Sequence, residues 1–109
     1  MKQEWLMITT DLIKQISQAK QYAGSALQSA KAAEFKSAAH NMFLAQEKIQ
    51  SAKLIQADLL ATDNMVSNSE DILMNTLLSV HSEDHLVTAS AYLDLVSEFI
   101  NVYKRLMTE

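Results

Sequence analysis

The segment LMNTLLSVHSEDHLVTASAY, residues 73–92, carries the clearest apolar periodicity of the chain. Its apolar residues follow alternating steps of four and three, the spacing of a helical coiled-coil seam: Leu73, Leu77, Val80, Val87 and Ala91. Asp84 occupies the remaining position of this seam, where a buried, unpaired carboxylate would be costly. The segment therefore predicts a long helix in which Asp84 is protonated, paired or bound to a metal ion.

Two histidines border the same seam. His81, Asp84 and His85 stand at positions i, i+3 and i+4, so on a helix their side chains share a face. Imidazole offers an uncharged nucleophilic nitrogen near neutral pH and is also a common metal ligand. Spacing alone leaves three interpretations open: a metal site, a catalytic histidine with its helpers, and an ordinary helix surface.

Composition predicts an all-α protein with a single domain, residues 1–109. The chain has 109 residues, no proline and one glycine, which is typical of long helices with few turns. A polar break, ATDNMVSNSED at residues 61–71, contains a capping box formed by Ser67 and Glu70, so a helix is predicted over about 70–107. Residues 3–61 read as helical throughout, but one helix of about 90 Å would bury nothing, so a turn must lie within them.

Charge and cysteine content exclude several functions. The formal net charge of −4 offers no basic face for a phosphate backbone, so no nucleic-acid partner is expected. The absence of cysteine excludes disulfides, thiolate zinc sites and cysteine nucleophiles. With no signal peptide in MKQEWLMITT and no long apolar run, we expect a cytoplasmic protein without direct membrane insertion. The six methionines and an aromatic set are interpreted as core residues: Tyr22, Phe35 and Phe43.

Three segments together resemble a known family. LLSVHSEDHLVTASAYLDLVSEFINVYKRL resembles the carboxy-terminal helix of enzyme IIA components of the lactose/cellobiose (N,N'-diacetylchitobiose) branch of the bacterial phosphotransferase system, whose signature reads V-H-A-Q-D-H-L-M-T. SQAKQYAGSALQSAKAAEF is similar to the family's G-x-A-R-S-x-A-x-x-A-L-x-x-A-x-x-G-D-F, and SAKLIQADLL is similar to its A-H-x-x-Q-T-x-L-I. The resemblance covers nearly the whole chain.

The departures from the family pattern locate the missing turn. Ala33 and Glu34 stand where the family has Gly-Asp, so two helix formers replace the glycine that would mark the break. The turn is therefore predicted near residues 32–35, between helices at about 3–32 and 35–61. Four other positions differ from the family pattern: Ser17 replaces a glycine, Lys20 an arginine, Lys53 a histidine and Ala57 a threonine. Phe35 and Gln56 are the same as in the family pattern.

The resemblance implies an antiparallel three-helix bundle that assembles as a homotrimer. It implies a phosphocarrier, a phosphotransferase component with a phosphohistidine intermediate. A phosphoryl group would pass from phospho-HPr to His81, then to a cysteine of enzyme IIB, for uptake of a β-linked disaccharide by the enzyme IIC permease. His85 is expected to support this transfer, and Gln56 and Lys53 from the second helix are further candidates.

The resemblance also implies that Asp84 lies on the trimer axis. Three copies would share a divalent cation there, and we expect Mg²⁺, one per trimer, because it suits carboxylate and water ligands. The alternatives are that these acids are protonated or that the seam packs only within a monomer.

Two other functions compete with the phosphocarrier. The pattern H-x-x-D-H resembles the reversed zinc motif H-x-x-E-H of a metal-dependent hydrolase, but a catalytic zinc wants a third protein ligand. The second is a structural or regulatory interaction protein, a member of the same family that has lost catalysis through changes such as those at Lys20, Lys53 and Ala57.

Overall fold

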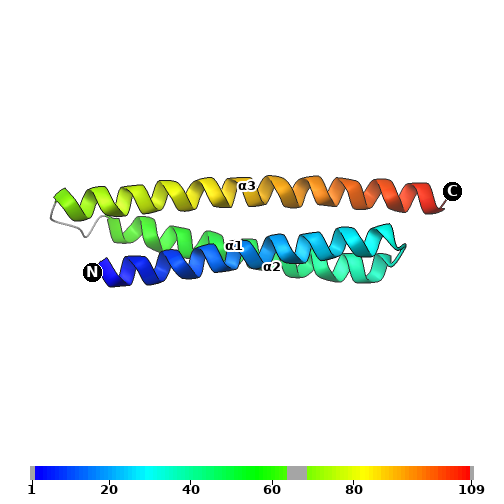
Figure 1. The fold of residues 1–109 in the computed structure, drawn as a ribbon, viewed down its shortest axis with the longest axis horizontal. Coiled ribbons are helices and arrows are strands. Elements are labelled where there is room, and N and C mark those ends of the chain that lie inside the picture. The colour runs from blue at the N-terminus through cyan, green and yellow to red at the C-terminus, as the bar shows by residue number, and fades with distance from the viewer. Residues whose placement is uncertain (1, 64–68, 109) are drawn as a thin grey trace.

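The protein is a bundle of three helices with no strand in the residues that the computed structural model describes, 2–63 and 69–108. The helices are α1 (Lys2–Lys31), α2 (Phe35–Asp63) and α3 (Ser69–Thr108), as Figure 1 shows. Their ends lie within two residues of the predicted ranges. The predicted all-α class is confirmed, whereas the Ser67 part of the predicted capping box lies outside the described residues.

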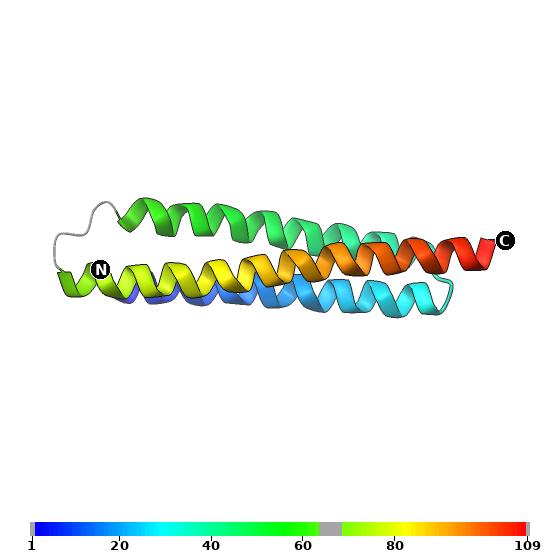
Figure 2. The ribbon, with the colours of Figure 1, turned by 90° about the horizontal axis from the view of Figure 1, so that it is seen from above.

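The helices run along one rod of 62 × 16 × 15 Å. Figures 1 and 2 show that α1 and α3 run in the same direction and α2 runs in the opposite one. Each helix packs against both others. A residue near the middle of α3 can therefore have neighbours from α1 on one side and from α2 on the other.

The core is built from heptad spacing in every helix. The buried residues of α1 follow steps of four and three: Trp5, Thr9, Leu12, Ile16, Ala19, Ala23, Ala26 and Ala30. The other two helices add Ala38, Ala45, Ile49, Ala52, Gln56 and Leu59 from α2, and Asn75, Ser79, Ser82, Leu86, Ala89, Leu93 and Val96 from α3. Because many of these side chains are small, the helices approach one another closely.

The turn between α1 and α2 ends α1 in a Schellman motif. The Glu34 N–H donates to the Ser29 carbonyl at 2.8 Å, and the Ala33 N–H donates to the Ala30 carbonyl at 3.0 Å. This motif places Ala33 in the left-handed region, with φ of 61°, where glycine is the usual residue. The turn lies where it was predicted, and the backbone keeps a glycine conformation although the side chain is alanine.

Helix α3 exposes many of its large apolar side chains on the outside of the protomer, while others, such as Leu93, are buried. Its buried face begins with polar residues, Asn75, Ser79 and Ser82. The predicted seam lies on the outer face, where the side chains are about half exposed: Leu73 61%, Leu77 58%, Val80 56% and Val87 58%. The alternative in which this seam packs only within the monomer is therefore wrong.

The prediction that the six methionines and the aromatic set lie in the core is wrong for several of these residues. Phe43 is 59% exposed on α2, and Met7, Met74 and Met107 are exposed too. Trp5, in contrast, is fully buried in the core. Apolar character did not separate the core from the surface because helices in this bundle carry apolar residues on more than one face.

Candidate functional site

His81 and His85 form a contacting pair in the middle of α3. Their ring centroids are 4.6 Å apart and their planes make an angle of 82°, an edge-to-face arrangement. His81 is exposed, whereas His85, one turn further on, is half-buried. His81 can therefore meet a partner from solution while His85 restricts the positions that the His81 ring can adopt.

The histidine pair opens into a pocket at the boundary of α3 and α1. This pocket has a volume of about 320 Å³ and is lined by Lys20 from α1 and by His81, Asp84, His85 and Thr88 from α3. Helices α1 and α3 run in the same direction (Figure 1), and the shared pocket shows that Lys20 lies level with the histidines although it is far from them in sequence. The sequence showed Lys20 only as a replacement for arginine, and no local pattern connected it to His81.

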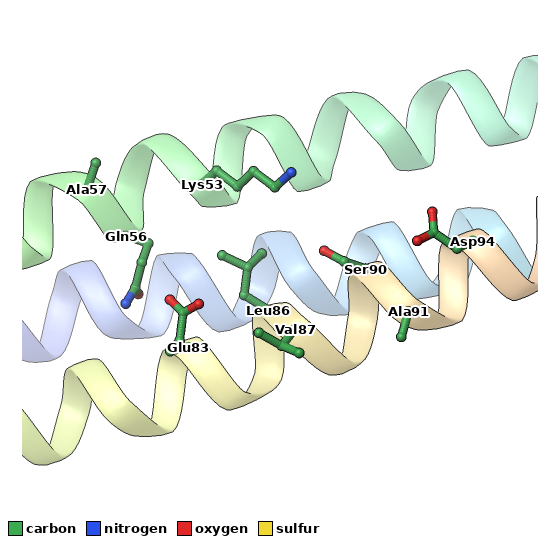
Figure 3. Close-up of a pocket in the computed structure, with 9 residues that line it drawn as sticks. All are labelled: Lys53, Gln56, Ala57, Glu83, Leu86, Val87, Ser90, Ala91 and Asp94. Carbon is green, nitrogen blue, oxygen red and sulfur yellow. The ribbon is translucent and has the colours of Figure 1, made fainter.

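A second groove lies on the other flank of α3, against α2. Figure 3 shows its lining, with Lys53, Gln56 and Ala57 from α2 and six residues from α3: Glu83, Leu86, Val87, Ser90, Ala91 and Asp94. The Gln56 side chain points from α2 toward α3, and its Nε2 donates to the Ser79 carbonyl at 3.3 Å. Within one protomer, Lys53 and Gln56 thus line a different groove from that of His81.

Gln56 is a buried contact between two helices. It is 4% exposed, and its Oε1 accepts no hydrogen bond from the described residues. The structure gives it a position between α2 and the backbone of α3, close to Glu83 and Asp84 in a small pocket with Val80. A supporting role for Gln56 in phosphoryl transfer therefore stays a prediction.

Asp84 lies between the two flanks of α3. It lines the pocket with His81 and Lys20 on the α1 side and also a pocket with Gln56 and Glu83 on the α2 side. Its side chain is exposed, in line with the apolar residues of the outer seam. An exposed carboxylate in an apolar stripe fits a position where copies of the chain meet.

One protomer does not supply a metal site by itself. Among the described residues there is no group of three or more His, Cys, Asp or Glu side chains that could hold a metal ion. The hydrolase alternative therefore lacks its third ligand in this part of the chain. The cation expected at Asp84 stays a prediction, because it would need carboxylates from several chains.

None of the helices in residues 2–63 and 69–108 combines the length and the apolar character that a membrane crossing requires.

Sequence comparison finds one protein family along most of the chain. Residues 7–104 match the family described as "PTS system, Lactose/Cellobiose specific IIA subunit". A cellobiose-specific EIIA component of Lactococcus lactis is 33% identical over 94% of this chain and 85% of its own length. An N,N'-diacetylchitobiose-specific EIIA component of Escherichia coli is 29% identical over 91% of this chain and 82% of its own length.

Two solved structures share the fold. The IIA(Chitobiose)–HPr complex of Escherichia coli contains a chain with a TM-score of 0.81 and 26% identity, covering 94% of this chain and 96% of that one. The cellobiose-specific enzyme IIA of Bacillus anthracis has a TM-score of 0.77 and 30% identity, covering 94% and 91%. Both neighbours are IIA proteins of the same kind as the sequence relatives.

Proposed function

The chain belongs to the lactose/cellobiose-specific IIA family of the phosphotransferase system, and we propose that His81 is its phosphoryl acceptor. As a IIA component it is a phosphotransferase that works through a phosphohistidine. The observation that carries the assignment to His81 is its exposure beside a half-buried histidine, in a pocket that also holds a lysine. His40, the remaining histidine, is exposed on α2 and belongs to none of these contacts.

The proposed reaction is a relay between imidazoles and a thiolate. An unprotonated ring nitrogen of His81 bonds to phosphorus while the P–N bond of phospho-HPr breaks, and its electron pair returns to the HPr imidazole. In the second step a cysteine thiolate of enzyme IIB attacks the same phosphorus, and the electron pair of the His81 P–N bond returns to His81. Phosphoryl transfer of this kind depends mainly on positioning and charge stabilisation.

The proposal includes the partners of the relay. One structural neighbour is a IIA protein in complex with HPr, which supports HPr as the donor. Enzyme IIB is the acceptor, and the enzyme IIC permease is served indirectly, in the uptake of a β-linked disaccharide of the cellobiose or chitobiose type. The proposed location is the cytoplasm, where these partners would act.

A homotrimer is the proposed assembly. The outer seam of α3 exposes apolar side chains along the helix, and packing three α3 helices about an axis would bury them. Burial of each half-exposed Leu or Val would contribute about 1 kcal/mol. The same packing brings three Asp84 carboxylates together, and a divalent cation with water ligands, Mg²⁺ above all, would neutralise them.

Phosphorylation of the purified protein tests the assignment. Enzyme I, HPr and labelled phosphoenolpyruvate should label the wild type with acid-labile, base-stable phosphate. His81→Ala should take up no label and keep the helical circular dichroism spectrum, because the exposed ring contributes little to the core. His40→Ala, which removes another exposed histidine, should label like the wild type; label retained by His81→Ala would refute the assignment.

A further inference from the structure

We propose that Lys20 is the cation that binds the phosphoryl group on His81. This inference rests on the proposed function and adds to it a residue from a different helix. Lys20 belongs to α1, and it lines the same pocket as His81, His85 and Thr88. The pocket thus combines a nucleophile, a hydroxyl and a permanent positive charge.

The charge of this pocket calls for a cation. Asp84 lines it too, but the cation proposed on the trimer axis would neutralise this carboxylate, so the phosphoryl group is the charge that Lys20 has to oppose. Phosphorylation adds a group that carries about −1.5 to −2 charges at neutral pH. A lysine ammonium opposes this charge and donates hydrogen bonds to phosphoryl oxygens, and charge-assisted hydrogen bonds are stronger than neutral ones.

The other charged groups nearby do not fill this role. Lys53 and Glu83 line the groove on the α2 flank, so the protomer keeps Lys53 on the opposite side of α3 from the pocket. His85 contacts the His81 ring itself and supplies no permanent charge. Lys20 is therefore the lysine that the protomer brings to the histidine pair.

The Lys20 side chain is also long and free to change its conformation. Its side chain is exposed, so it can follow the phosphoryl group and withdraw when the group leaves for the next carrier. It exchanges no proton in the reaction; it stabilises the phosphorylated state and the charge that develops during transfer. Lys20→Gln should therefore shift the transfer equilibrium as well as the rate.

The deciding measurement is the equilibrium distribution of phosphate between HPr and this protein. The equilibrium constant depends only on the separate phosphorylated and unphosphorylated proteins, whereas an effect on HPr docking changes rates alone. We expect Lys20→Gln to lower the equilibrium constant for phosphorylation of His81 by roughly three- to tenfold, as for loss of one partly screened charged contact. Lys20→Arg should restore it to within about twofold, since it keeps the charge.

A matched control removes the same charge elsewhere on α1. Lys14 is exposed and lies about 1.7 turns before Lys20, so it leaves the helix on a different face. Lys14→Gln should leave the equilibrium constant unchanged. An unchanged constant in Lys20→Gln, or an equal decrease in Lys14→Gln, would overturn the proposal while leaving His81 as acceptor; absence of label in the wild type would overturn the proposed function itself.

Discussion

The proposed support of His81 by His85 rests on the contact between their rings. The half-buried ring of His85 packs edge-to-face against His81, one helical turn away. Such a contact limits the rotamers of the exposed ring and so helps to hold its reactive nitrogen toward the pocket that contains Lys20. The lysine at position 20 keeps a positive charge where the resemblance has an arginine, so this departure is compatible with activity.

His85→Ala should slow phosphoryl transfer without abolishing it. The accepting nitrogen remains, but its orientation is lost, and misplacement of a reacting group costs up to about 100-fold in rate. Rapid-quench measurement of labelling by phospho-HPr should show a rate roughly 10- to 100-fold below the wild type, with the same final label. Complete loss of label in His85→Ala, with label kept in His81→Ala, would reverse the two roles.

Ala33→Gly should stabilise the protein. Ala33 holds a left-handed conformation in the Schellman motif, which costs an alanine about 1–2 kcal/mol relative to its ordinary conformations. Glycine avoids this cost but loses more entropy on folding, which leaves a net gain of about 1 kcal/mol. Urea unfolding should show a higher midpoint with an unchanged slope; Ala33→Val, which cannot adopt this conformation easily, should show a lower one.

At the scale of the helix, Gly24 is a glycine in a conformation that suits alanine, the reverse of Ala33. It lies inside α1 with no positive φ, and a methyl group added there would stand 3.6 Å from the Tyr92 hydroxyl, an ordinary van der Waals distance. Alanine is a better helix former than glycine by about 1 kcal/mol. The single glycine of the chain is therefore in a position where alanine fits.

Gly24→Ala should raise the free energy of unfolding by about 0.5–1 kcal/mol. Thermal and urea unfolding monitored by circular dichroism provide the measurement. Gly24→Leu serves as the comparison, because its larger side chain would clash with the Tyr92 hydroxyl and should remove the gain. A destabilised Gly24→Ala would show that α1 and α3 approach more closely at this position than the 3.6 Å distance indicates.

At the scale of the whole molecule, one face of α3 packs inside the protomer, and the opposite face is left exposed for the proposed assembly. The inner face begins with small polar residues such as Ser82 and continues with larger buried ones such as Leu93, and it packs against α1 and α2. The outer face holds Leu73, Leu77 and Val80, whose exposure is unfavourable for an isolated protomer. Folding of one chain therefore leaves an apolar seam exposed, and packing against the α3 helices of other chains would cover it.

Sedimentation should detect a trimer of 12.2 kDa chains that loses stability when a chelator is added. The reason is repulsion between three Asp84 carboxylates once the proposed cation is removed. Asp84→Leu should remove the chelator sensitivity, because an apolar side chain fills the seam without charge. Asp94→Leu, which replaces an exposed acid on the α2 flank of α3, should leave the chelator sensitivity unchanged.

Two outcomes would separate assembly from metal binding. A wild-type protein that sediments as a monomer with and without chelator contradicts the assembly. A trimer that is equally stable in both conditions contradicts the cation and leaves the assembly in place.

The sequence by itself determined the helices and the histidine pair, and its resemblance to a known family located the turn. Heptad spacing is a local property, and so is the i, i+4 relation that brings His81 and His85 into contact. The turn at Ala33 was found only through the resemblance, because alanine hides a backbone conformation that glycine would have marked. Local patterns sufficed wherever the relevant residues lie on one helix.

Only the tertiary structure decided which face of α3 points inward and which residues of other helices meet it. The stripe that contains the predicted seam stays outside, because the opposite face of α3 supplies both the large side chains that fill the core and small ones, such as Ser82 and Ala89, that allow close approach to the alanine-rich faces of α1 and α2. The packing of parallel α1 against α3 brings Lys20 to His81 and places Lys53 on the other flank. The register between helices depends on side chains of all three at once, and no pattern within a single segment contains it.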